Sequence, residues 1–315
     1  MRRSLVPLLA ALALLAVPAS APAKTRVAVG IGDQNAGMFA NPLYKQLKLK
    51  KTRYFIRWDA IDHPGELTRA DAFVNAAKAS KVKVLMHIST NNLATKQAKL
   101  PSVARYKRAV KPLVARFRAR GVKDWGVWNE ANHVTQPTYR SPKRAARFYR
   151  AFRRFPCAGC KLVALDVLDQ RGVERYVRRW LRAAGAAGRR ARVIGIHNYA
   201  EVNRLVRKAT KRYPGTGRII AAVRKKNRRA RFWYTETGAI VKFASFGCSV
   251  TRAQGRLRYM FKLARRYDRY VERLYSYNWT GADCLNRFDA GLVYANGKPR
   301  PGYYTFKGQL MRFGR

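Results

Sequence analysis

Two short segments, Trp125-Gly-Val-Trp-Asn-Glu130 and Phe232-Trp-Tyr-Thr-Glu236, indicate how this chain folds. Each is an apolar and aromatic run that ends in a carboxylate, in a chain with only 16 acidic residues among 315. An apolar run of this length is typical of a buried strand. A glutamate that ends such a strand is delivered to the strand's carboxyl end. The two segments therefore predict two buried strands that each present one glutamate.

The rest of the chain alternates between strand and helix patterns. Hydrophobic period and turn signals predict eight strands, at 25–32, 52–58, 82–88, 123–129, 161–167, 192–198, 231–236 and 273–279. Helices are predicted between and after them, at 40–49, 67–80, 102–120, 141–154, 172–184, 216–227, 251–267 and 301–312. Alternation of this kind implies a parallel sheet, and eight repeats predict a single (β/α)8 TIM barrel of the α/β class over residues 24–315. The alternative is an open doubly wound sheet, but Gly30-Ile-Gly32-Asp-Gln-Asn-Ala lacks its G-x-G-x-x-G fingerprint.

The N-terminus has the pattern of a secretory signal peptide. Met1-Arg2-Arg3 precedes an apolar run from Leu5 to Val17 and the small residues of Ala19-Ser-Ala-Pro-Ala23. We therefore expect residues 1–23 to be a signal peptide, with cleavage near Ala23, and the mature protein to be secreted. The alternative is an uncleaved membrane anchor, although a spanning helix needs about 20 apolar residues and this run is shorter.

Four cysteines in an exported chain suggest disulfides. Cys157 and Cys160 lie close together in the sequence, which leaves Cys248 and Cys284 to pair with each other. Half a zinc site or a redox pair is the alternative for the first two. No second closely spaced Cys or His pair completes a zinc site, and the sequence around Cys157 has no thioredoxin-like context. A bridge between Cys248 and Cys284 would tie together the loops after the seventh and eighth strands.

The net charge of +51 is extreme. Such a field could attract nucleic acid, an anionic cell-wall polymer or an acidic polysaccharide. The basic residues, however, form stripes opposite apolar stripes on several predicted helices, as in 140–154, 174–182 and 256–266. Charge on every helix is typical of solvated helix faces, so the sequence indicates no single basic patch. Non-specific association with a polyanion or a cell wall stays open as an interpretation.

The acidic residues are segregated from the helices. Half of them fall at or just beyond a predicted strand end, namely Asp33, Asp59, Glu130, Asp166, Asp169, Glu201, Glu236 and Asp283. Active sites of (β/α)8 barrels lie at the carboxyl ends of the strands. A general depletion of acids would not produce this segregation, so we expect the functional site at that end of the barrel.

Trp128-Asn-Glu130, His197-Asn-Tyr199, Glu236 and Trp279 resemble motifs of the retaining (β/α)8-barrel glycoside hydrolases, the clan of the family 5 cellulases and mannanases and the family 39 xylosidases. That clan places an Asn-Glu pair at the end of strand 4 and a second Glu at the end of strand 7. Asn129-Glu130 and Glu236 end the fourth and seventh predicted strands. The resemblance implies a glycosidase that cleaves a poly- or oligosaccharide by double displacement, without cofactor or metal.

The resemblance also assigns roles to these residues. Glu130 would be the acid/base and Glu236 the nucleophile, with their carboxyl groups about 5–5.5 Å apart. An acid needs a raised pKa, which apolar cover from Trp125 or Trp128 could supply. The alternative is that both glutamates are structural carboxylates paired with arginines.

Seven further residues would bind the substrate or support the nucleophile. Asn129 resembles the partner of the sugar 2-hydroxyl, and Tyr199 the tyrosine that hydrogen-bonds the nucleophile, with His197 lining the same site. Arg57 resembles a buried arginine that keeps the nucleophile ionised. The remaining three, a second histidine and two candidate stacking platforms, are His87, Trp58 and Trp279.

Each of these residues also has a structural interpretation. Arg57 could pair with Asp59 or Asp33, since surface ion pairs of this kind are common. The two histidines could be core residues, and the two tryptophans could be barrel packing. Asp166 and Asp169 follow the fifth strand, where the clan has no fixed catalytic group, so no chemistry is assigned to them.

Two other classes of function compete with the glycosidase. One is an inactive barrel that binds a cell-wall or other anionic polymer through its basic surface, and intact Glu130 and Glu236 argue against it. The other is an exported nucleic-acid or polyanion binder, whose binding would fall steeply with salt. We expect a monomer with a carbohydrate substrate, and no obligate protein partner is evident.

Overall fold

Eight parallel strands close into a barrel in the order in which they occur along the chain. The computed structural model describes residues 25–92, 98–204, 215–244 and 246–314, and the predicted signal peptide lies outside them. The strands are β1 (Ala28–Gly32), β2 (Lys51–Arg57), β3 (Lys83–Ser89), β4 (Asp124–Gly126), β5 (Lys161–Leu168), β6 (Val193–His197), β7 (Arg231–Thr237) and β9 (Val271–Tyr277). The predicted (β/α)8 barrel and all eight of its strands are confirmed.

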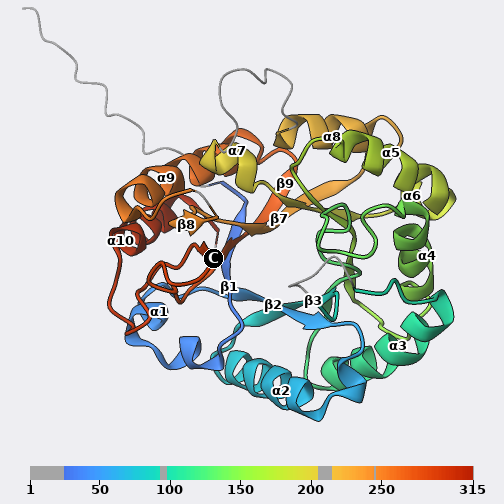
Figure 1. The fold of residues 1–315 in the computed structure, drawn as a ribbon, viewed down its shortest axis with the longest axis horizontal. Helices are drawn as coiled ribbons and strands as arrows, with labels where there is room; N and C mark the ends of the chain where they lie inside the picture. Colours follow the sequence, from blue (N-terminus) through green and yellow to red (C-terminus); the bar gives the residue numbers. More distant parts are fainter. Residues whose placement is uncertain (1–24, 93–97, 205–214, 245, 315) are drawn as a thin grey trace, which may run out of the picture.

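A ring of helices surrounds the barrel (Figure 1). The predicted helices are present as α1 (Pro42–Gln46), α2 (Pro64–Ala79), α3 (Val103–Ala119), α4 (Pro142–Phe152), α5 (Val173–Ala184), α8 (Thr216–Arg224), α9 (Val250–Arg266) and α10 (Pro301–Gln309). Shorter helices are α6 (Ala186–Arg189), α7 (Tyr199–Asn203), η1 (Ala36–Ala40), η2 (Ala60–Asp62) and η3 (Leu310–Arg312). In the described ranges, none of the helices combines the length and hydropathy that a transmembrane span requires.

The helices begin and face the barrel as their sequences dictate. Ser102, Ser141 and Ser249 precede α3, α4 and α9, and each side chain accepts a hydrogen bond from a backbone N–H of the first turn. On α4 the apolar stripe, which includes Phe148 and Phe152, is buried, while the basic stripe remains exposed. The positive charge therefore lies on the outside of the helix ring.

Strand β4 is shorter than predicted, because it ends at Gly126 instead of continuing to residue 129. The imidazole of His87 fills the space beside Gly126, where an added Cβ would lie 2.1 Å from His87 Cδ2. Beyond this point the chain turns, with Asn129 N bonded to Ile88 O of β3. Glu130 follows with φ of +42°, a left-handed conformation that non-glycine residues adopt mainly where surrounding contacts impose it.

The amino-terminal half of the barrel is closed by a buried ion pair. Arg273 of β9 lies with its guanidinium carbon 3.7 Å from the ring centroid of Trp233. The same guanidinium binds Asp124 of β4, with Nη1 2.5 Å from Oδ2, and the two side chains are 9% and 11% exposed. This pair joins opposite sides of the barrel beneath the site.

Replacing Asp124 by alanine should lower the free energy of unfolding by about 3–5 kcal/mol, because it leaves the Arg273 charge buried without its partner. Chemical denaturation measures the change. The matched control is Glu66→Ala, which removes an exposed ion pair with Arg69 and should cost at most about 1 kcal/mol. Equal losses for the two variants would contradict the assignment of the Asp124–Arg273 pair as a buried brace.

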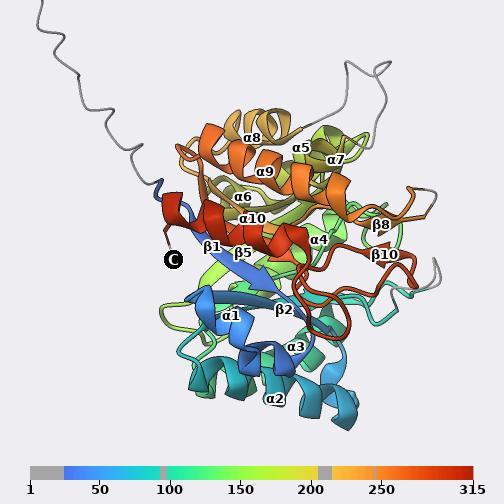
Figure 2. The same ribbon diagram turned by 90° about the vertical axis from the view of Figure 1, so that its left-hand side faces the viewer.

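The carboxyl ends of the strands carry an additional two-stranded ribbon. β8 (Lys242–Phe243) pairs antiparallel with β10 (Phe288–Asp289), at the end of the barrel toward which the strand arrows point (Figure 2). Both predicted disulfides are present: Cys157–Cys160, just before β5, and Cys248–Cys284, between the loops after β7 and β9. The second bridge connects two loops on the side of the barrel where the site was predicted.

Candidate active site

The two glutamates that the sequence singles out lie together at the carboxyl ends of the strands. One carboxylate oxygen of Glu130 lies within 4.8 Å of one carboxylate oxygen of Glu236, and a ring nitrogen of His197 lies within the same distance of both. The glutamate side chains are 16% and 12% exposed, so both are accessible from the mouth of the barrel. This separation is close to the about 5–5.5 Å of retaining glycosidases and shorter than the about 6.5–9.5 Å of inverting ones.

Glu236 is held by two neighbours. Arg53 places Nη1 2.6 Å from Glu236 Oε2, and the Tyr199 hydroxyl donates to Glu236 Oε1 at 3.0 Å. The hydrogen bond expected for Tyr199 is therefore present, although Tyr199 begins α7 and does not lie on a strand. Burial, followed by the adjacent charge of Glu236, raises the pKa of Tyr199, so the phenol stays protonated and can donate.

The arginine beside Glu236 is Arg53, and the prediction of Arg57 is wrong. Arg57 is the last residue of β2, and its Nε lies 2.5 Å from Asp59 Oδ1 at the rim, as the alternative interpretation had it. Arg53 is on the same face of the strand but four residues earlier, which is about 13 Å farther back along the strand and so deeper in the barrel. Only the deeper residue, with 1% of its side chain exposed, reaches the level of Glu236.

Arg53 also orients the residue beside Glu130. Its Nη2 donates to Asn129 Oδ1 at 2.5 Å, and its Nε lies 3.4 Å from His87 Nδ1. Because the amide oxygen of Asn129 is engaged in this way, its NH2 group is the one left to face a substrate hydroxyl. One guanidinium thus positions both the strand 4 and the strand 7 parts of the site.

A buried chain of two histidines and an aspartate lies beneath Glu130. His197 Nδ1 lies 3.0 Å from Glu130 Oε1, and His197 Nε2 lies 3.0 Å from Asp166 Oδ1. The other oxygen of Asp166 lies 3.2 Å from His87 Nε2 and accepts a hydrogen bond from Thr235 at 2.7 Å. Asp166 and both histidines have no exposed side-chain surface. His87 is therefore a core residue, and its prediction as a sugar contact is wrong.

The charges of this chain follow from its geometry. Burial by itself would lower the pKa of His197, but the charges of Asp166 and Glu236 and the hydrogen bonds to Asp166 and Glu130 raise it to about 10. Burial opposes ionisation of Asp166, yet the two histidines hold its pKa below the ordinary value. For His87 burial prevails over Asp166 and lowers the pKa to about 3. His197 is therefore an imidazolium at neutral pH, and His87 is neutral.

The environment of Glu130 differs from the prediction. Burial favours its protonated form, but the hydrogen bond and charge of His197, with a smaller contribution from His133, lower its pKa below the ordinary value. The expected tryptophan cover is absent, because Trp128 stacks on Phe148 of α4 at 5.2 Å and Trp125 contacts Phe152 of the same helix. The residues that set the protonation of Glu130 are thus histidines.

The two predicted stacking platforms are packing residues. Trp279 is 1% exposed and lies between Tyr44 of α1 and Tyr303 of α10, with ring centroids 5.5 and 6.1 Å away. Trp58 is 2% exposed, and the guanidinium carbon of Arg105 lies 5.3 Å from its ring centroid. Trp279 offers no open face to a sugar, so the prediction of stacking is wrong for it. Trp58 borders a cavity that Leu100 and Arg105 also line, but almost none of its ring surface is exposed there.

A different set of aromatic rings, which sequence reasoning missed, lies beside Glu236. Tyr277 ends β9, and the charge of Glu236 adds to burial in raising its pKa. Its ring centroid lies 6.4 Å from that of Phe55 and 6.2 Å from that of Phe288, which in turn lies 5.7 Å from Tyr199. Phe55, Tyr277 and Phe288 are half-buried and can contact a ligand. The sequence feature that could have identified Tyr277 as a site residue is its position two residues before Trp279.

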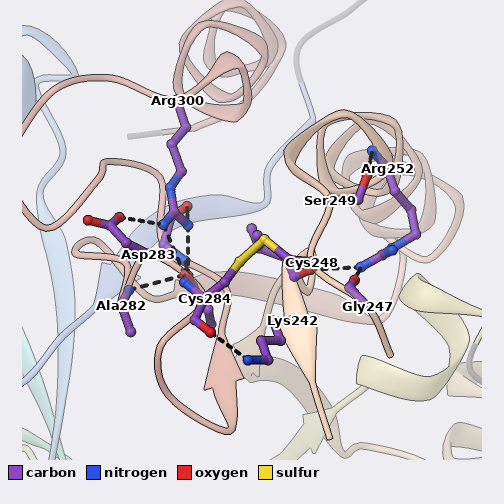
Figure 3. Close-up of a disulfide and its surroundings, with 12 residues drawn as sticks. Lys242, Gly247, Cys248, Ser249, Arg252, Ala282, Asp283, Cys284 and Arg300 are labelled. Carbon is purple, nitrogen blue, oxygen red and sulfur yellow. Dashed lines mark hydrogen bonds and ion pairs between the residues drawn. A yellow bond between two sulfur atoms is a disulfide. The ribbon is translucent and has the colours of Figure 1, made fainter. Parts of the chain in front are cut away.

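The loop after β9, which carries Phe288, is fixed by polar contacts and by the Cys248–Cys284 disulfide that Figure 3 shows. Asp289 accepts hydrogen bonds from the backbone of Ala282, Cys284 and Gly291 and pairs with Arg300 at 2.7 Å. Lys242 Nζ donates to Cys284 O at 2.5 Å, beside the Cys248–Cys284 disulfide. The Asp289–Arg300 ion pair and the Cys248–Cys284 disulfide therefore hold the loop that contributes Phe288 to the aromatic side of the site.

Other acids at strand ends bind loop backbone. Asp33 accepts from the N–H groups of Trp279 and Thr280, each at 3.0 Å. Asp169 accepts from those of Ala200 and Glu201, at 3.0 and 2.7 Å. These carboxylates fix the loops. Asp166, to which the sequence assigns no chemistry, lies at the centre of the site.

In the described part of the chain, one group of side chains has the spacing of a metal site, namely Glu130, His197 and Glu236. Their coordinating atoms already have partners. Arg53 and Tyr199 bind the two oxygens of Glu236, and the Nδ1 of His197 is bonded to Glu130. A guanidinium and an imidazolium in contact with the carboxylates repel a cation. We assign no metal to this group.

Several solved structures share this fold at low sequence identity. Xylanase B from Clostridium stercorarium F9 matches with a TM-score of 0.59 and 14% identity, over 89% of this chain and 96% of that chain. A psychrophilic glycoside hydrolase family 10 endo-β-1,4-xylanase matches with a TM-score of 0.61 and 16% identity, over the same shares. A glucosidase from Croceicoccus marinus has a TM-score of 0.63 and 15% identity, over 91% of this chain and 66% of that chain.

No family model matches the sequence, and no curated protein matches it. At these identities the structural matches show a shared fold. The chain thus has the (β/α)8 barrel that glycoside hydrolases use, and the expectation of that architecture is confirmed.

Proposed function

We propose that this protein is a secreted, retaining glycoside hydrolase that acts on a poly- or oligosaccharide. The observation that carries the proposal is the placement of Glu130 after β4 and Glu236 in β7, with carboxylate oxygens within 4.8 Å of each other. The fold shared with xylanases and a glucosidase supports the same class of reaction. Two carboxyl groups at this spacing suit nucleophilic attack by one and proton transfer by the other.

The mechanism assigns one task to each group. Glu236, oriented by Arg53 and Tyr199, attacks the anomeric carbon while Glu130 protonates the departing glycosidic oxygen. A covalent glycosyl-enzyme forms on Glu236. Glu130 then removes a proton from the water that hydrolyses it, so the product retains its anomeric configuration. Asn129 supplies its NH2 to the sugar 2-hydroxyl, and no step needs a cofactor.

A mechanism-based covalent label tests the proposal directly. A panel of activated 2-fluoro glycosides that differ in sugar configuration is incubated with the protein, and the labelled peptide is mapped by mass spectrometry. A label on Glu236 with one configuration supports retention and identifies the sugar. Absence of a label with every sugar, together with no hydrolysis of natural glycans, would reject the enzyme in favour of a barrel that only binds.

Arg53 should matter far more to turnover than Arg57. Replacing Arg53 by methionine removes the ion pair of Glu236 and the anchor of Asn129, so kcat/KM should fall by roughly 10²–10³-fold. Arg57→Met, which removes a rim ion pair with Asp59, should change kcat/KM by less than about fivefold. Steady-state kinetics with thermal melts of both variants provide the comparison. If kcat/KM fell equally in the two variants, Arg57 would have to be counted as an active-site residue.

Secretion and association with a charged polymer belong to the same proposal. The signal-peptide pattern of residues 1–23 and two disulfides suit an oxidising compartment outside the cell. The outer face of α5 exposes four arginines, Arg175, Arg178, Arg179 and Arg182. A basic exterior of this kind would keep the enzyme near an anionic cell wall. Retention on such a wall should fall steeply with salt and be unaffected by Glu236→Gln.

A further inference from the structure

We propose that the proton which Glu130 gives to the leaving group is stored on His197, and that Asp166 is the positioning residue that keeps it there. This inference rests on the proposed function and names a proton source for the same site. His197 acts through Glu130 and does not touch the substrate. The acid of the reaction is then the pair formed by Glu130 and His197, which shares one proton.

The geometry gives this proton a single path. His197 has no exposed side-chain surface, so its imidazole exchanges protons only with the groups that surround it. Nδ1 is hydrogen-bonded to Glu130 Oε1 at 3.0 Å, and Nε2 lies 3.0 Å from Asp166 Oδ1 in an ionic contact. Thr235 donates to the other oxygen of Asp166, and His87 Nε2 lies 3.2 Å from that oxygen, so the carboxylate is kept in place beside His197. Of Glu130, His197 and Asp166, only Glu130 reaches the mouth of the barrel.

Among the described residues, the charged groups that face His197 are mainly carboxylates. Asp166 of β5, Glu130 after β4 and Glu236 of β7 are negative, and Glu236 Oε2 lies 3.9 Å from His197 Nδ1. Arg53 of β2 is positive, but it is already paired with Glu236 at 2.6 Å. His87 of β3 is neutral. Three carboxylates against one guanidinium favour the imidazolium form of His197.

The proton transfer balances over one catalytic cycle. In the first step the Nδ1–H bond of His197 breaks as a proton moves to Glu130 Oε1, and the proton passes from the Glu130 carboxyl group to the glycosidic oxygen as the C–O bond cleaves. His197 is left neutral, with its remaining proton on Nε2, 3.0 Å from Asp166 Oδ1. In the second step Glu130 takes a proton from the attacking water and returns it to Nδ1. The chain ends each cycle as it began.

The partly exposed histidine near Glu130 is a poorer proton store. His133 lies 3.8 Å from Glu130 Oε2, and its Nδ1 is engaged with Thr135 Oγ1 at 2.7 Å. It is 28% exposed and has no buried carboxylate behind it of the kind that Asp166 provides for His197. A proton on His133 exchanges with bulk water, so it is not retained for the substrate.

The test compares leaving groups in His197→Asn. In His197→Asn no proton is held beside Glu130, so at pH 7 the departing oxygen can be protonated only if Glu130 takes a proton from solvent. We therefore expect kcat/KM for a glycoside with a poor leaving group to fall by about 10²-fold or more at pH 7, and much less at pH 5. A dinitrophenyl glycoside needs no acid, so its kcat/KM should change by less than about tenfold. A uniform loss with both substrates at both pH values would overturn the proposal.

Asp166→Asn keeps the size of the side chain and tests the store separately. The active form carries the shared proton, and the raised pKa of His197 keeps it there as the pH rises through neutrality. Without the negative charge of Asp166 the proton is lost at lower pH, so the basic limb of the kcat/KM profile should move down by at least one pH unit. The matched control is His63→Asn, a histidine at the start of α2, which should leave this limb in place. If the basic limb of the kcat/KM profile of Asp166→Asn stayed at the pH of the original protein, the proposal would be contradicted.

A measurement without substrate separates this inference from the proposed function. In protein labelled with 15N-histidine, the nitrogen shifts of His197 should report protonation at both ring nitrogens at pH 7–8, and Asp166→Asn should convert the ring to the neutral form. If the protein turns over glycans while His197 is neutral at pH 7, the proton store is wrong and the glycosidase stands. If His197 is an imidazolium but no glycan is cleaved, the proposed glycosidase function is wrong, while the assignment of a stored proton to His197 stands.

Discussion

Replacing Glu236 by glutamine is expected to abolish turnover, with kcat lowered by at least about 10⁴-fold, because the amide cannot form the covalent intermediate. The barrel should remain intact, since glutamine preserves the shape of the side chain, its amide oxygen can still accept from Arg53, and its NH2 group can donate to the hydroxyl oxygen of Tyr199. Initial rates on the sugar found by labelling provide the measurement, and calorimetric titration checks that the sugar still binds.

The matched control for this variant is Glu174→Gln on α5, which removes a carboxylate from the outside of the helix ring. It should leave kcat within about twofold of the original value. If Glu236→Gln retained more than about a tenth of the activity, Glu236 would not be the nucleophile, and a mechanism with direct attack by water would have to replace the one proposed.

Replacing Glu130 by alanine should have the second largest effect, a fall of about 10²–10⁴-fold in kcat/KM with poor leaving groups, because general acid catalysis is lost. With a dinitrophenyl glycoside the first step should remain fast and the glycosyl-enzyme should accumulate, since no base activates the water. Azide needs no general base and fits the space left by the carboxylate. It should therefore accelerate turnover and yield a glycosyl azide of retained configuration.

Rapid-quench kinetics and NMR of the azide product measure both parts of this result. The positive charge of His197, no longer paired with Glu130, should favour entry of the anion. An azide product of inverted configuration would show that no covalent intermediate precedes it, and would contradict the assignment of Glu236. Unchanged rates with azide would remove Glu130 from the role of acid/base.

The sequence was sufficient for the architecture and for the two glutamates. The period of two in strands and the longer period of helices locate each element, and an apolar run that ends in Glu places that residue at the barrel mouth. The helix and strand limits differ from prediction by up to three residues, one case being the end of β4. There the end of the strand depends on a contact between Gly126 and the imidazole of His87, which no local pattern encodes.

The rest of the site could not be predicted because it depends on depth and on contacts across the barrel. Alternation puts Arg53 and Arg57 on one face of β2, but it does not say which of them lies level with a glutamate on β7. Asp166 gains its role only from the histidines of β3 and β6 that converge on it. Trp279 resembles a platform in sequence, yet the turn after β9 directs it into the helix ring.

The close approach of His87 to Gly126 makes these two positions dependent on each other in evolution. A side chain larger than hydrogen at position 126 meets the imidazole at 2.1 Å, so it can become established only after position 87 has become smaller. A smaller residue there would remove one of the partners of Asp166. A library that varies position 126 alone would therefore return few folded members, whereas joint variation of positions 87 and 126 opens a path to a differently tuned acid.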